Sequence, residues 1–101
     1  MYRVIWMYDV TPETAAVFER VYGADGDWVR LFRSARGYLR TELFRSVTMP
    51  ERYLTVDDWD SAAAYEIFRA RSAAAYAELD ARCDELTQGE RLVWAGETNG
   101  G

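Results

Sequence analysis

The order of strand-like and helix-like segments restricts what this chain can fold into more than any other feature of its sequence. Segments 2–10, 38–47, 52–58 and 91–96 are rich in β-branched and aromatic residues or alternate between apolar and polar residues, a pattern that is typical of strands. Apolar residues at helical spacing fill most of the chain between the first two of these segments and between the last two. The sequence therefore predicts the order β-α-β-β-α-β.

Capping residues and glycines give the predicted helices their ends. The first helix is expected to begin at Thr11, which proline follows in the favoured first position, and to end at Gly23. A short extra helix is expected over residues 28–33. The long second helix is expected to bend near residues 71–72, where its apolar stripe thins. The pattern predicts a ferredoxin-like α+β fold, with the helices on one face of a four-stranded antiparallel sheet.

Length and composition indicate a single folded unit. The chain has 101 residues, of which 50% are apolar and 15% aromatic. This is enough to fill one hydrophobic core, and the chain is too short for a second domain. We expect one domain over residues 1–97 and a disordered tail over residues 98–101.

The charged residues exclude several partners and several kinds of chemistry. Acidic residues number 17 against 12 basic ones, so nucleic acids and anionic membranes, which require basic surfaces, are not expected as partners. The chain has no His, and all of its basic residues are Arg. This composition removes imidazole catalysis, His-ligated metals and haem, and lysine Schiff bases. Carboxylate, guanidinium, phenol, indole and one thiol remain for catalysis.

Cys83 and the hydropathy pattern indicate the compartment. A lone Cys excludes an internal disulfide and a thiolate zinc cluster, and it suits a reducing cytoplasm. The amino terminus lacks the pattern of a secretory signal peptide, and no apolar run approaches the roughly 18 residues that a membrane span needs. We expect a cytoplasmic protein with no membrane contact.

The first predicted strand is apolar on both of its faces. Alternate residues of segment 2–8 lie on one side, and Ile5 and Met7 lie on the other. The last strand is apolar on both sides too, with Leu92 and Trp94 expected to share a face. Helices can cover only one face, so we expect a second copy to cover the other in a homodimer. The alternative is a monomer whose edge strands are apolar on both sides.

The passage from Tyr53 to Phe68 carries a resemblance to a known family. A strand ends there in Trp59, the small polar residue Ser61 caps the next helix, and Tyr65 follows on its first turns. In this passage, in length and in element order, nearly the whole chain resembles the antibiotic biosynthesis monooxygenase (ABM) domains of the dimeric α/β-barrel superfamily. The resemblance implies a dimeric barrel. It also implies oxidation of polycyclic aromatic phenols to quinones by dioxygen, with no metal and no cofactor.

Carried over residue by residue, the resemblance makes Trp59 and Tyr65 candidate catalytic residues. The best-studied branch of the family has an Asn four residues before the Trp. Thr55 stands at that position here and offers a hydroxyl but no amide. Arg82 is the candidate counterpart of a family Arg farther along the second helix. The haem-degrading and olivetolic-acid-cyclase-like branches rely on His and are disfavoured, because this chain has none.

Each candidate aromatic residue also has a structural interpretation. Trp59 would either line a ligand cavity and donate its indole N–H to a substrate oxygen, or pin the helix to the sheet. Tyr65 would either relay a proton from a phenol or pack with Phe68 on the inner stripe of the helix. Trp28 and Phe32 would either form a lid over the cavity or anchor their own short helix.

Charged residues of the central hairpin are the other catalytic candidates. Arg40 would stabilise an oxyanion and Asp57 would act as a base, or each would form a cross-strand ion pair. Simple alternation places Arg40 on the face of Tyr38. Tyr76, on the stripe of the long helix, is a candidate substrate contact. Asp57 and Asp58 are not expected to bind a metal, because neighbouring residues of a strand point to opposite faces.

Three functions remain open at this point. The first is a cofactor-independent monooxygenase acting on an aromatic or polyketide-type small molecule. The second is an oxygen-independent cyclase, dehydratase or isomerase on the same barrel, with Asp57 or Tyr65 as acid or base. The third is a non-catalytic dimer that binds an aromatic ligand or a protein, which Thr55 in place of Asn favours. A hollow interior with convergent polar groups would favour an enzyme.

Overall fold

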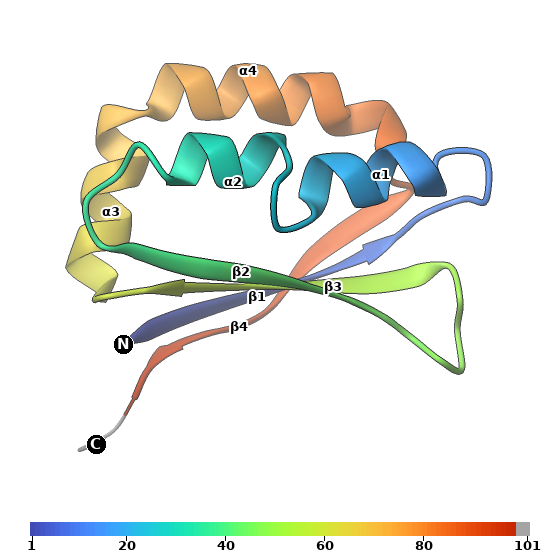
Figure 1. Cartoon of the computed structure of the whole chain (residues 1–101), viewed down its shortest axis with the longest axis horizontal. Helices are drawn as coiled ribbons and strands as arrows, with labels where there is room; N and C mark the ends of the chain where they lie inside the picture. Colours follow the sequence, from blue (N-terminus) through green and yellow to red (C-terminus); the bar gives the residue numbers. More distant parts are fainter. Residues whose placement is uncertain (99–101) are drawn as a thin grey trace.

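Four strands form one antiparallel sheet in the computed structural model, which describes residues 1–98 (Figure 1). The strand order is β2-β3-β1-β4, so the predicted ferredoxin-like α+β fold is confirmed. The elements are β1 (Tyr2–Asp9), α1 (Ala15–Tyr22), α2 (Asp27–Phe32), β2 (Tyr38–Arg45), β3 (Arg52–Trp59), α3 (Ala62–Arg71), α4 (Ala73–Cys83), a single 3-10 turn (Asp84–Leu86) and β4 (Gly89–Glu97).

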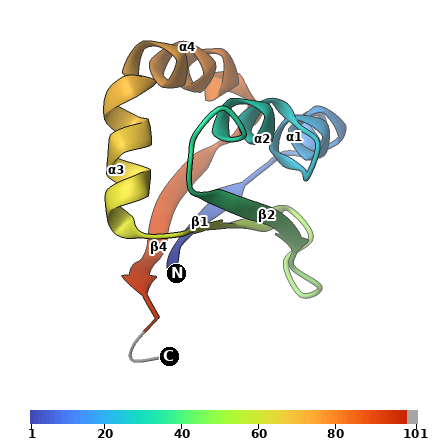
Figure 2. The same ribbon diagram turned by 60° about the vertical axis from the view of Figure 1, so that its left-hand side comes forward.

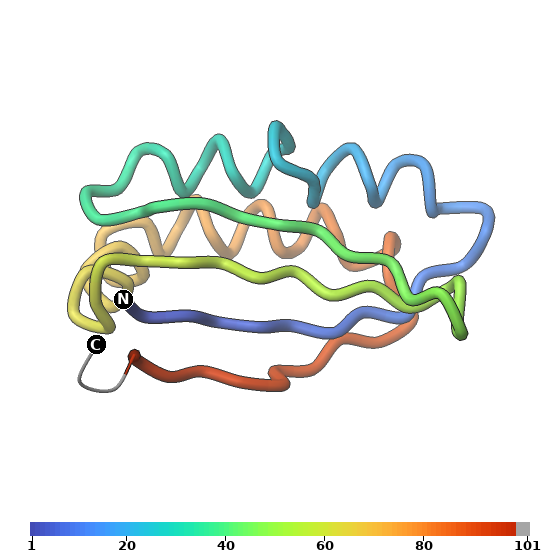
Figure 3. The backbone as a smooth tube through the Cα atoms, turned by 60° about the horizontal axis from the view of Figure 1, so that its bottom comes forward, coloured from blue at the N-terminus to red at the C-terminus, as the bar shows by residue number. Residues whose placement is uncertain are grey.

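The helices lie on one side of the sheet and leave its other face uncovered (Figure 2). Helices α1, α2 and α4 lie above the strands, while α3 descends from α4 toward the end of β3. Figure 3 shows the strands side by side, with β2 and β4 at the two edges of the sheet. The two faces of the sheet therefore have different surroundings, and a side chain on β1 or β3 meets either the helices or the uncovered side.

Aromatic side chains fill the layer between helices and sheet. Phe18 and Trp59 are fully buried, and Tyr53 is almost so. Phe18 stacks on Tyr22 with ring centroids 4.2 Å apart, and Trp59 meets Phe32 edge to face at 5.6 Å. Aromatic pairs in such arrangements contribute about 0.5–1.5 kcal/mol beyond the area they bury. The cluster fixes α1 and α2 against β3.

The long second helical region follows its sequence signals. Ser61 caps α3, because its hydroxyl accepts a hydrogen bond from the backbone N–H of Ala64 at 3.1 Å. The helical region breaks at Ser72 and continues as α4, which confirms the bend predicted near residues 71–72. The break lets α3 and α4 take different directions (Figure 2), so that both can face the same interior space.

The first helix starts later than its sequence suggests. It begins at Ala15 rather than at Thr11, so that prediction was wrong. The backbone N–H of Thr14 bonds to the Thr11 carbonyl at 3.1 Å, closing a turn before the helix. The Thr14 hydroxyl then donates to the carbonyl of Leu86 at 3.0 Å. This tertiary contact holds the turn, and a sequence pattern cannot reveal it.

An irregularity in β2 changes which of its residues share a face. The register with β3 shifts between Tyr38 and Arg40, so Leu39 is an extra residue on that strand. Tyr38 packs against Trp59 on the helix side, with ring centroids 5.3 Å apart. The expectation that Tyr38 and Arg40 share a face was wrong, because a bulge adds one residue to its strand.

Large apolar side chains remain exposed on the helix-free face of the sheet. Phe44 of β2 is 48% exposed and Trp94 of β4 is 57% exposed. Trp94 pairs with Ile5, whereas Leu92 pairs with Trp6, because the β1–β4 register shifts between Ile5 and Trp6. Leu92 and Trp94 therefore lie on opposite faces, and the prediction that they share one was wrong.

The two ends of the described chain meet beside the sheet. The backbone N–H of Thr98 donates to the carbonyl of Met1 at 2.8 Å, and the Met1 ammonium donates to the Thr98 hydroxyl at 3.1 Å. The rest of the predicted tail, residues 99–101, lies outside the described residues. Among residues 1–98, no helix has the length and apolar character that crossing a membrane requires.

Gly37 has a backbone conformation that favours glycine, with φ at 94°. A Cβ at this position would lie 2.7 Å from the Cβ of Ala64 on α3. We expect Gly37→Ala to lower the free energy of unfolding by about 1–3 kcal/mol, measured by urea denaturation. Gly89→Ala is the matched control, because a Cβ there meets nothing nearer than 3.9 Å. Equal losses in both variants would contradict the assigned strain.

Candidate active site

A cavity of about 200 Å³ lies between the sheet and the helices. Its walls come from all four strands and from α1, α2, α3 and α4. Seven of its lining side chains are aromatic: Trp6, Tyr8, Tyr22, Trp28, Phe32, Tyr65 and Tyr76. A wider groove of about 690 Å³ beside α3 has no buried titratable side chain in its described lining. The smaller, aromatic-walled cavity is therefore the candidate site.

Asp57 is the buried carboxylate of this cavity. It lies on β3 two residues before Trp59, on the helix-facing side of the sheet, and is 8% exposed. Thr41 of β2, directly across the strand pair, donates its hydroxyl to Asp57 Oδ1 at 2.6 Å. The Tyr38 hydroxyl donates in turn to Thr41 Oγ1 at 2.8 Å. No group among residues 1–98 hydrogen-bonds Asp57 Oδ2, which leaves that oxygen available to a ligand.

Burial raises the pKa of Asp57 to about 6. The hydrogen bond from Thr41 opposes this rise, and the charge of Asp58 adds to it. Desolvation disfavours the ionised carboxylate, so the carboxylate of Asp57 binds a proton more tightly than that of an exposed Asp does. A carboxyl with this pKa is mostly ionised at neutral pH and is a stronger base than an ordinary one.

Among residues 1–98, Arg69 is the one cation that lines the cavity. It lies one helical turn after Tyr65 on α3 and donates to the Tyr65 hydroxyl at 3.0 Å. Its guanidinium carbon lies 3.9 Å from the centre of the Tyr76 ring on α4, a cation–π contact. Arg69 therefore bridges the two helices that the break at Ser72 separates, and it holds a positive charge at the edge of the cavity.

The hydroxyls of Tyr8, Tyr22 and Tyr76 in the cavity stay protonated. Burial raises the pKa of Tyr76 to about 12 and that of Tyr8 still further. Burial also raises the pKa of Tyr22. The hydroxyl of Thr55 donates to that of Tyr8 at 3.3 Å, which places two neutral polar groups on the floor of the cavity. At neutral pH these phenols can donate hydrogen bonds, but they do not act as bases.

Six of the residues proposed from the sequence line this cavity. They come from four separate elements and meet only in the folded chain. The six are Trp28, Phe32, Thr55, Asp57, Tyr65 and Tyr76.

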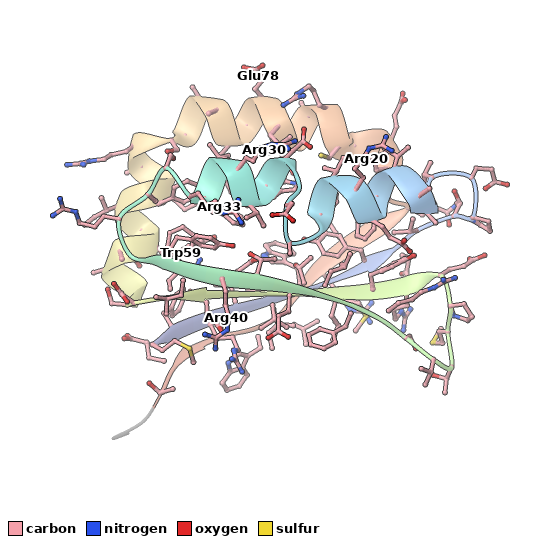
Figure 4. All side chains as sticks on the ribbon, viewed as in Figure 1. Arg20, Arg30, Arg33, Arg40, Trp59 and Glu78 are labelled. Atoms are coloured by element: carbon pink, nitrogen blue, oxygen red, sulfur yellow. The ribbon has the colours of Figure 1, made fainter. Side chains whose placement is uncertain are left out.

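Trp59 lies beneath the cavity rather than in its wall. It is fully buried, touches Tyr65 at a ring distance of 5.4 Å, and is absent from the lining. Its indole N–H has no hydrogen-bond partner within residues 1–98. Its position between sheet and helices, visible in Figure 4, fits the interpretation of a packing residue that supports Tyr65.

Arg40 and Arg82 lie away from the cavity. Arg40 is on the helix-free face of the sheet (Figure 4), where its guanidinium bonds to Asp58 Oδ2 at 2.9 Å. The bulge at Leu39 is the reason, because without it Arg40 would face Asp57. Arg82 lies on the exposed side of α4, next to Asp27 and Arg30 of α2. Neither Arg borders the cavity.

Sequence reasoning missed the polar residues that complete the site. Arg69 carried a signal, because it stands four residues after Tyr65 and so lies on the same helical face. Thr41 carried none, because simple alternation placed it on the face opposite Arg40, and the bulge at Leu39 turns it toward Asp57. Asp80 on α4 carried one, because it stands four residues after Tyr76, whereas Glu90 on β4 carried none. They meet the cavity through the packing of α4 over the end of the sheet.

The fold and the cavity define a small α+β domain with an aromatic interior chamber and a buried carboxylate. The family model described as antibiotic biosynthesis monooxygenase matches residues 1–78. The chain therefore belongs to the antibiotic biosynthesis monooxygenase family. Comparison with curated protein sequences gives no significant match.

Solved structures share the fold at low sequence identity. A candidate antibiotic biosynthesis monooxygenase from Deinococcus radiodurans is 15% identical, with a TM-score of 0.76 over 100% of this chain and 95% of that one. A second, from Bordetella bronchiseptica, is 23% identical, with a TM-score of 0.72 over 97% and 96%. The N63A mutant of SnoaB, a cofactor-independent oxygenase from Streptomyces nogalater, is 17% identical, with a TM-score of 0.66 over 99% and 97%.

Proposed function

We propose that this protein is a cofactor-independent oxygenase that oxidises a small phenolic molecule with dioxygen. The observation that carries the proposal is the buried carboxylate of Asp57, which opens into an aromatic cavity beside a guanidinium group. The family assignment and the structural similarity to SnoaB, a cofactor-independent oxygenase, support it. A flat ring would lie between the aromatic walls, against Trp28, Phe32 and Tyr76, with Thr55 close to its oxygen.

In this mechanism Asp57 takes the proton of the substrate phenol. An ordinary phenol has a pKa of about 10, and the Asp57 carboxyl has a pKa of about 6. The gap of roughly four units corresponds to about 5 kcal/mol against proton transfer. Arg69 is the cavity cation that offsets this cost, because a guanidinium stabilises a developing phenolate. Asp57 is therefore the proposed base, and Arg69 replaces Arg40 as the proposed electrostatic stabiliser.

The remaining steps balance without any cofactor. The phenolate gives an electron to dioxygen, and the two radicals combine at a ring carbon to form a C–O bond. The resulting peroxide anion takes up the proton held by Asp57 and becomes a hydroperoxide. Loss of the ring hydrogen and cleavage of the O–O bond release water and leave a quinone. One phenol and one dioxygen thus give one quinone and one water, and the aromatic walls exclude bulk water during the transfer.

The helix-free face of the sheet supports a homodimer as part of this proposal. Phe44 and Trp94 are about half exposed there, and apolar area of this kind normally marks an interface. A second copy packed sheet against sheet would close the barrel. The cytoplasmic location, expected from the lone Cys83, stays a prediction.

Oxygen uptake and quinone formation test the proposal. Purified protein is incubated with a panel that runs from single-ring phenol through alpha-naphthol to anthrone, in buffer saturated with air or free of oxygen. We expect quinone to form above the protein-free blank, with matching oxygen consumption, only in the aerated samples. Product that forms without oxygen would overturn the oxygenase in favour of an isomerase or cyclase. Binding of the phenols without any product would overturn it in favour of a non-catalytic binding protein.

Arg69→Gln tests the role of the cavity cation. Removing a donor that stabilises a developing oxyanion costs on the order of 100-fold in rate, so we expect kcat/KM to fall by about that factor. Arg71→Gln is the matched control, because Arg71 is exposed on the same helix and does not line the cavity. Similar rates for the two variants would contradict the assignment of Arg69.

A further inference from the structure

The titratable groups of the cavity carry an excess of negative charge. Three carboxylates line it, from Asp57, Asp80 and Glu90, against the single cation of Arg69. Asp57 is buried, whereas Asp80 and Glu90 are exposed at the edge of the cavity. With all four groups ionised, the lining has two negative charges in excess. This sign matters for ligand choice, because a recess lined by one sign of charge attracts the other.

The three carboxylates act on the same space. The charges of Asp57 and Glu90 both reach the Tyr8 hydroxyl, and those of Asp57 and Asp80 both reach the Tyr76 hydroxyl. Burial, and then the charge of Asp80, raises the pKa of Glu90. Pairs of these carboxylates therefore lie close enough to influence the same two rings of the cavity, and Asp80 lies close enough to influence Glu90.

The protein does not neutralise these carboxylates itself. Within residues 1–98, none of the three forms an ion pair, while Arg3, Arg30, Arg33, Arg40 and Arg52 pair with other acids. Arg69 contacts two phenol rings, through its bond to Tyr65 and its stack on Tyr76, rather than a carboxylate. A cationic group on a ligand would therefore meet carboxylates that no cation among residues 1–98 pairs with.

The spacing and the surroundings favour an organic cation over a metal ion. The described part of the chain has no group of three Asp, Glu, His or Cys side chains placed to hold a metal. The cavity walls are instead aromatic side chains, among them Trp6 and Trp28, and aromatic walls bind ammonium groups through cation–π attraction. The unpartnered Oδ2 of Asp57, on a side chain more than nine-tenths buried, opens into the same space.

The volume limits the ligand to a small aromatic molecule. Cavities of about 150 Å³ hold benzene, and this cavity measures about 200 Å³. It therefore accommodates one substituted ring, with any further substituent reaching toward the exposed carboxylates of Asp80 and Glu90.

We propose that the cavity selects a single-ring phenol that carries a protonated amine, and rejects one that carries a carboxylate. The ring lies between the aromatic walls with its hydroxyl near Asp57, and the ammonium group lies between Asp80 and Glu90 at the cavity edge. The proposal rests on the cavity being the ligand site of the proposed function, but it does not depend on oxygen chemistry. It concerns binding, so it is tested apart from turnover.

Three phenols of nearly equal size test the selection. Tyramine carries an ammonium group, para-ethylphenol is neutral, and para-hydroxyphenylacetate carries a carboxylate. Isothermal titration calorimetry with the full chain near neutral pH gives the dissociation constant of each. We expect tyramine to bind about tenfold more tightly than para-ethylphenol, and the carboxylate to bind at least tenfold more weakly than para-ethylphenol, because each charge meets an unbalanced field. The preference for tyramine should shrink as salt is added.

The Asp80→Asn and Glu90→Gln variants locate the preference. Both residues are exposed, so folding should survive either change. In each variant, the logarithm of the ratio between the dissociation constants of para-ethylphenol and tyramine should fall to about half of its wild-type value. Glu78→Gln is the matched control. This substitution removes the same charge, but from the outer side of α4 (Figure 4), so the preference for tyramine should stay unchanged. An equal loss in all three variants would show only a general charge effect and would overturn the proposal.

Two further outcomes bear on the proposal. Tight binding of para-hydroxyphenylacetate, or no measurable binding of any of the three phenols, would overturn it. Binding that follows the expected order without oxygen uptake would support this inference while contradicting the oxygenase. Quinone formation from neutral phenols, with no preference for tyramine in binding, would support the oxygenase and contradict this inference.

Discussion

The Asp57→Asn variant is expected to be more stable than the wild type near pH 8 and to be nearly inactive. Burial raises the pKa of Asp57 from 3.8 to about 6 in the folded protein, so the folded state binds this proton more tightly than the unfolded state. The stability that comes from the protonated form is lost as pH rises from about 4 to about 6. At neutral pH and above, ionised Asp57 therefore destabilises the fold by about 2–3 kcal/mol, which the neutral amide removes.

The same substitution removes the proposed base. An asparagine in this position can still accept the hydrogen bond from Thr41, but it cannot take a proton from a phenol. Loss of a positioned general base lowers turnover by about 100- to 10,000-fold. We therefore expect stability and activity to move in opposite directions at one residue, as is common where function requires a buried charge.

Urea denaturation at several pH values tests the linkage. The stability difference between Asp57→Asn and the wild type should be largest near pH 8 and should nearly vanish near pH 3, where the wild-type carboxyl is mostly protonated in both the folded and the unfolded state. A difference that is the same at every pH would show that the side-chain change itself, and not the charge, alters stability. A variant that is less stable than the wild type near pH 8 would contradict the raised pKa.

The fold follows from local signals, and these are readable in the sequence. Alternating strands, the Ser61 cap and the thinning apolar stripe near residues 71–72 all act within a few residues of chain, so their consequences are confirmed. The start of α1 depends on a contact between Thr14 and Leu86, which are far apart in sequence. Local patterns therefore predicted the elements, while long-range contacts decided some of their ends.

The site was only partly readable for a related reason. Asp57 and Thr55 stand two residues apart on β3 and so share one face, and helical spacing placed Tyr65 and Tyr76 on the inner side of their helices. The position of Arg40 depended on cross-strand register. One extra residue at Leu39 turns Arg40 from Asp57 toward Asp58, on the opposite face. A bulge of one residue thus changes a catalytic candidate into a structural ion pair.

Asp58, the next residue along β3, presents the opposite electrostatic case. Its side chain is 1% exposed, accepts a hydrogen bond from Arg3 Nε at 2.7 Å, and forms an ion pair with Arg40 at 2.9 Å. The hydrogen bond from Arg3 holds the pKa of Asp58 below its usual value, despite the opposing effect of burial. Ionised Asp58 therefore stabilises the fold at neutral pH, whereas ionised Asp57 destabilises it.

The Asp58→Asn variant is accordingly expected to lose about 2 kcal/mol of unfolding free energy near neutral pH. The amide that replaces the carboxylate has an NH2 group, which cannot accept a hydrogen bond from the Arg3 or Arg40 guanidinium. Hydrogen bonds to charged groups contribute about 1.5–3 kcal/mol to the free energy of unfolding. Arg3 and Arg40 are 39% and 55% exposed, so water screens part of the loss. The stabilisation that ionised Asp58 gives to the fold is present above about pH 4 and is lost as pH falls through its lowered pKa. The stability loss of Asp58→Asn relative to the wild type should therefore shrink only in acid.

Asp57→Asn and Asp58→Asn serve as controls for each other, because they make the same chemical change at adjacent positions of one strand. Urea denaturation of both variants near pH 8 should give stability changes of opposite sign, and enzyme assays should show a large loss of activity for Asp57→Asn alone. Stability changes of the same sign would mean that an ionised carboxylate has the same effect on both faces of the sheet. The buried cavity beside Asp57 and the ion pairs of Asp58 with Arg3 and Arg40 require opposite effects. The division of β3 into a catalytic side and a structural side would then fail.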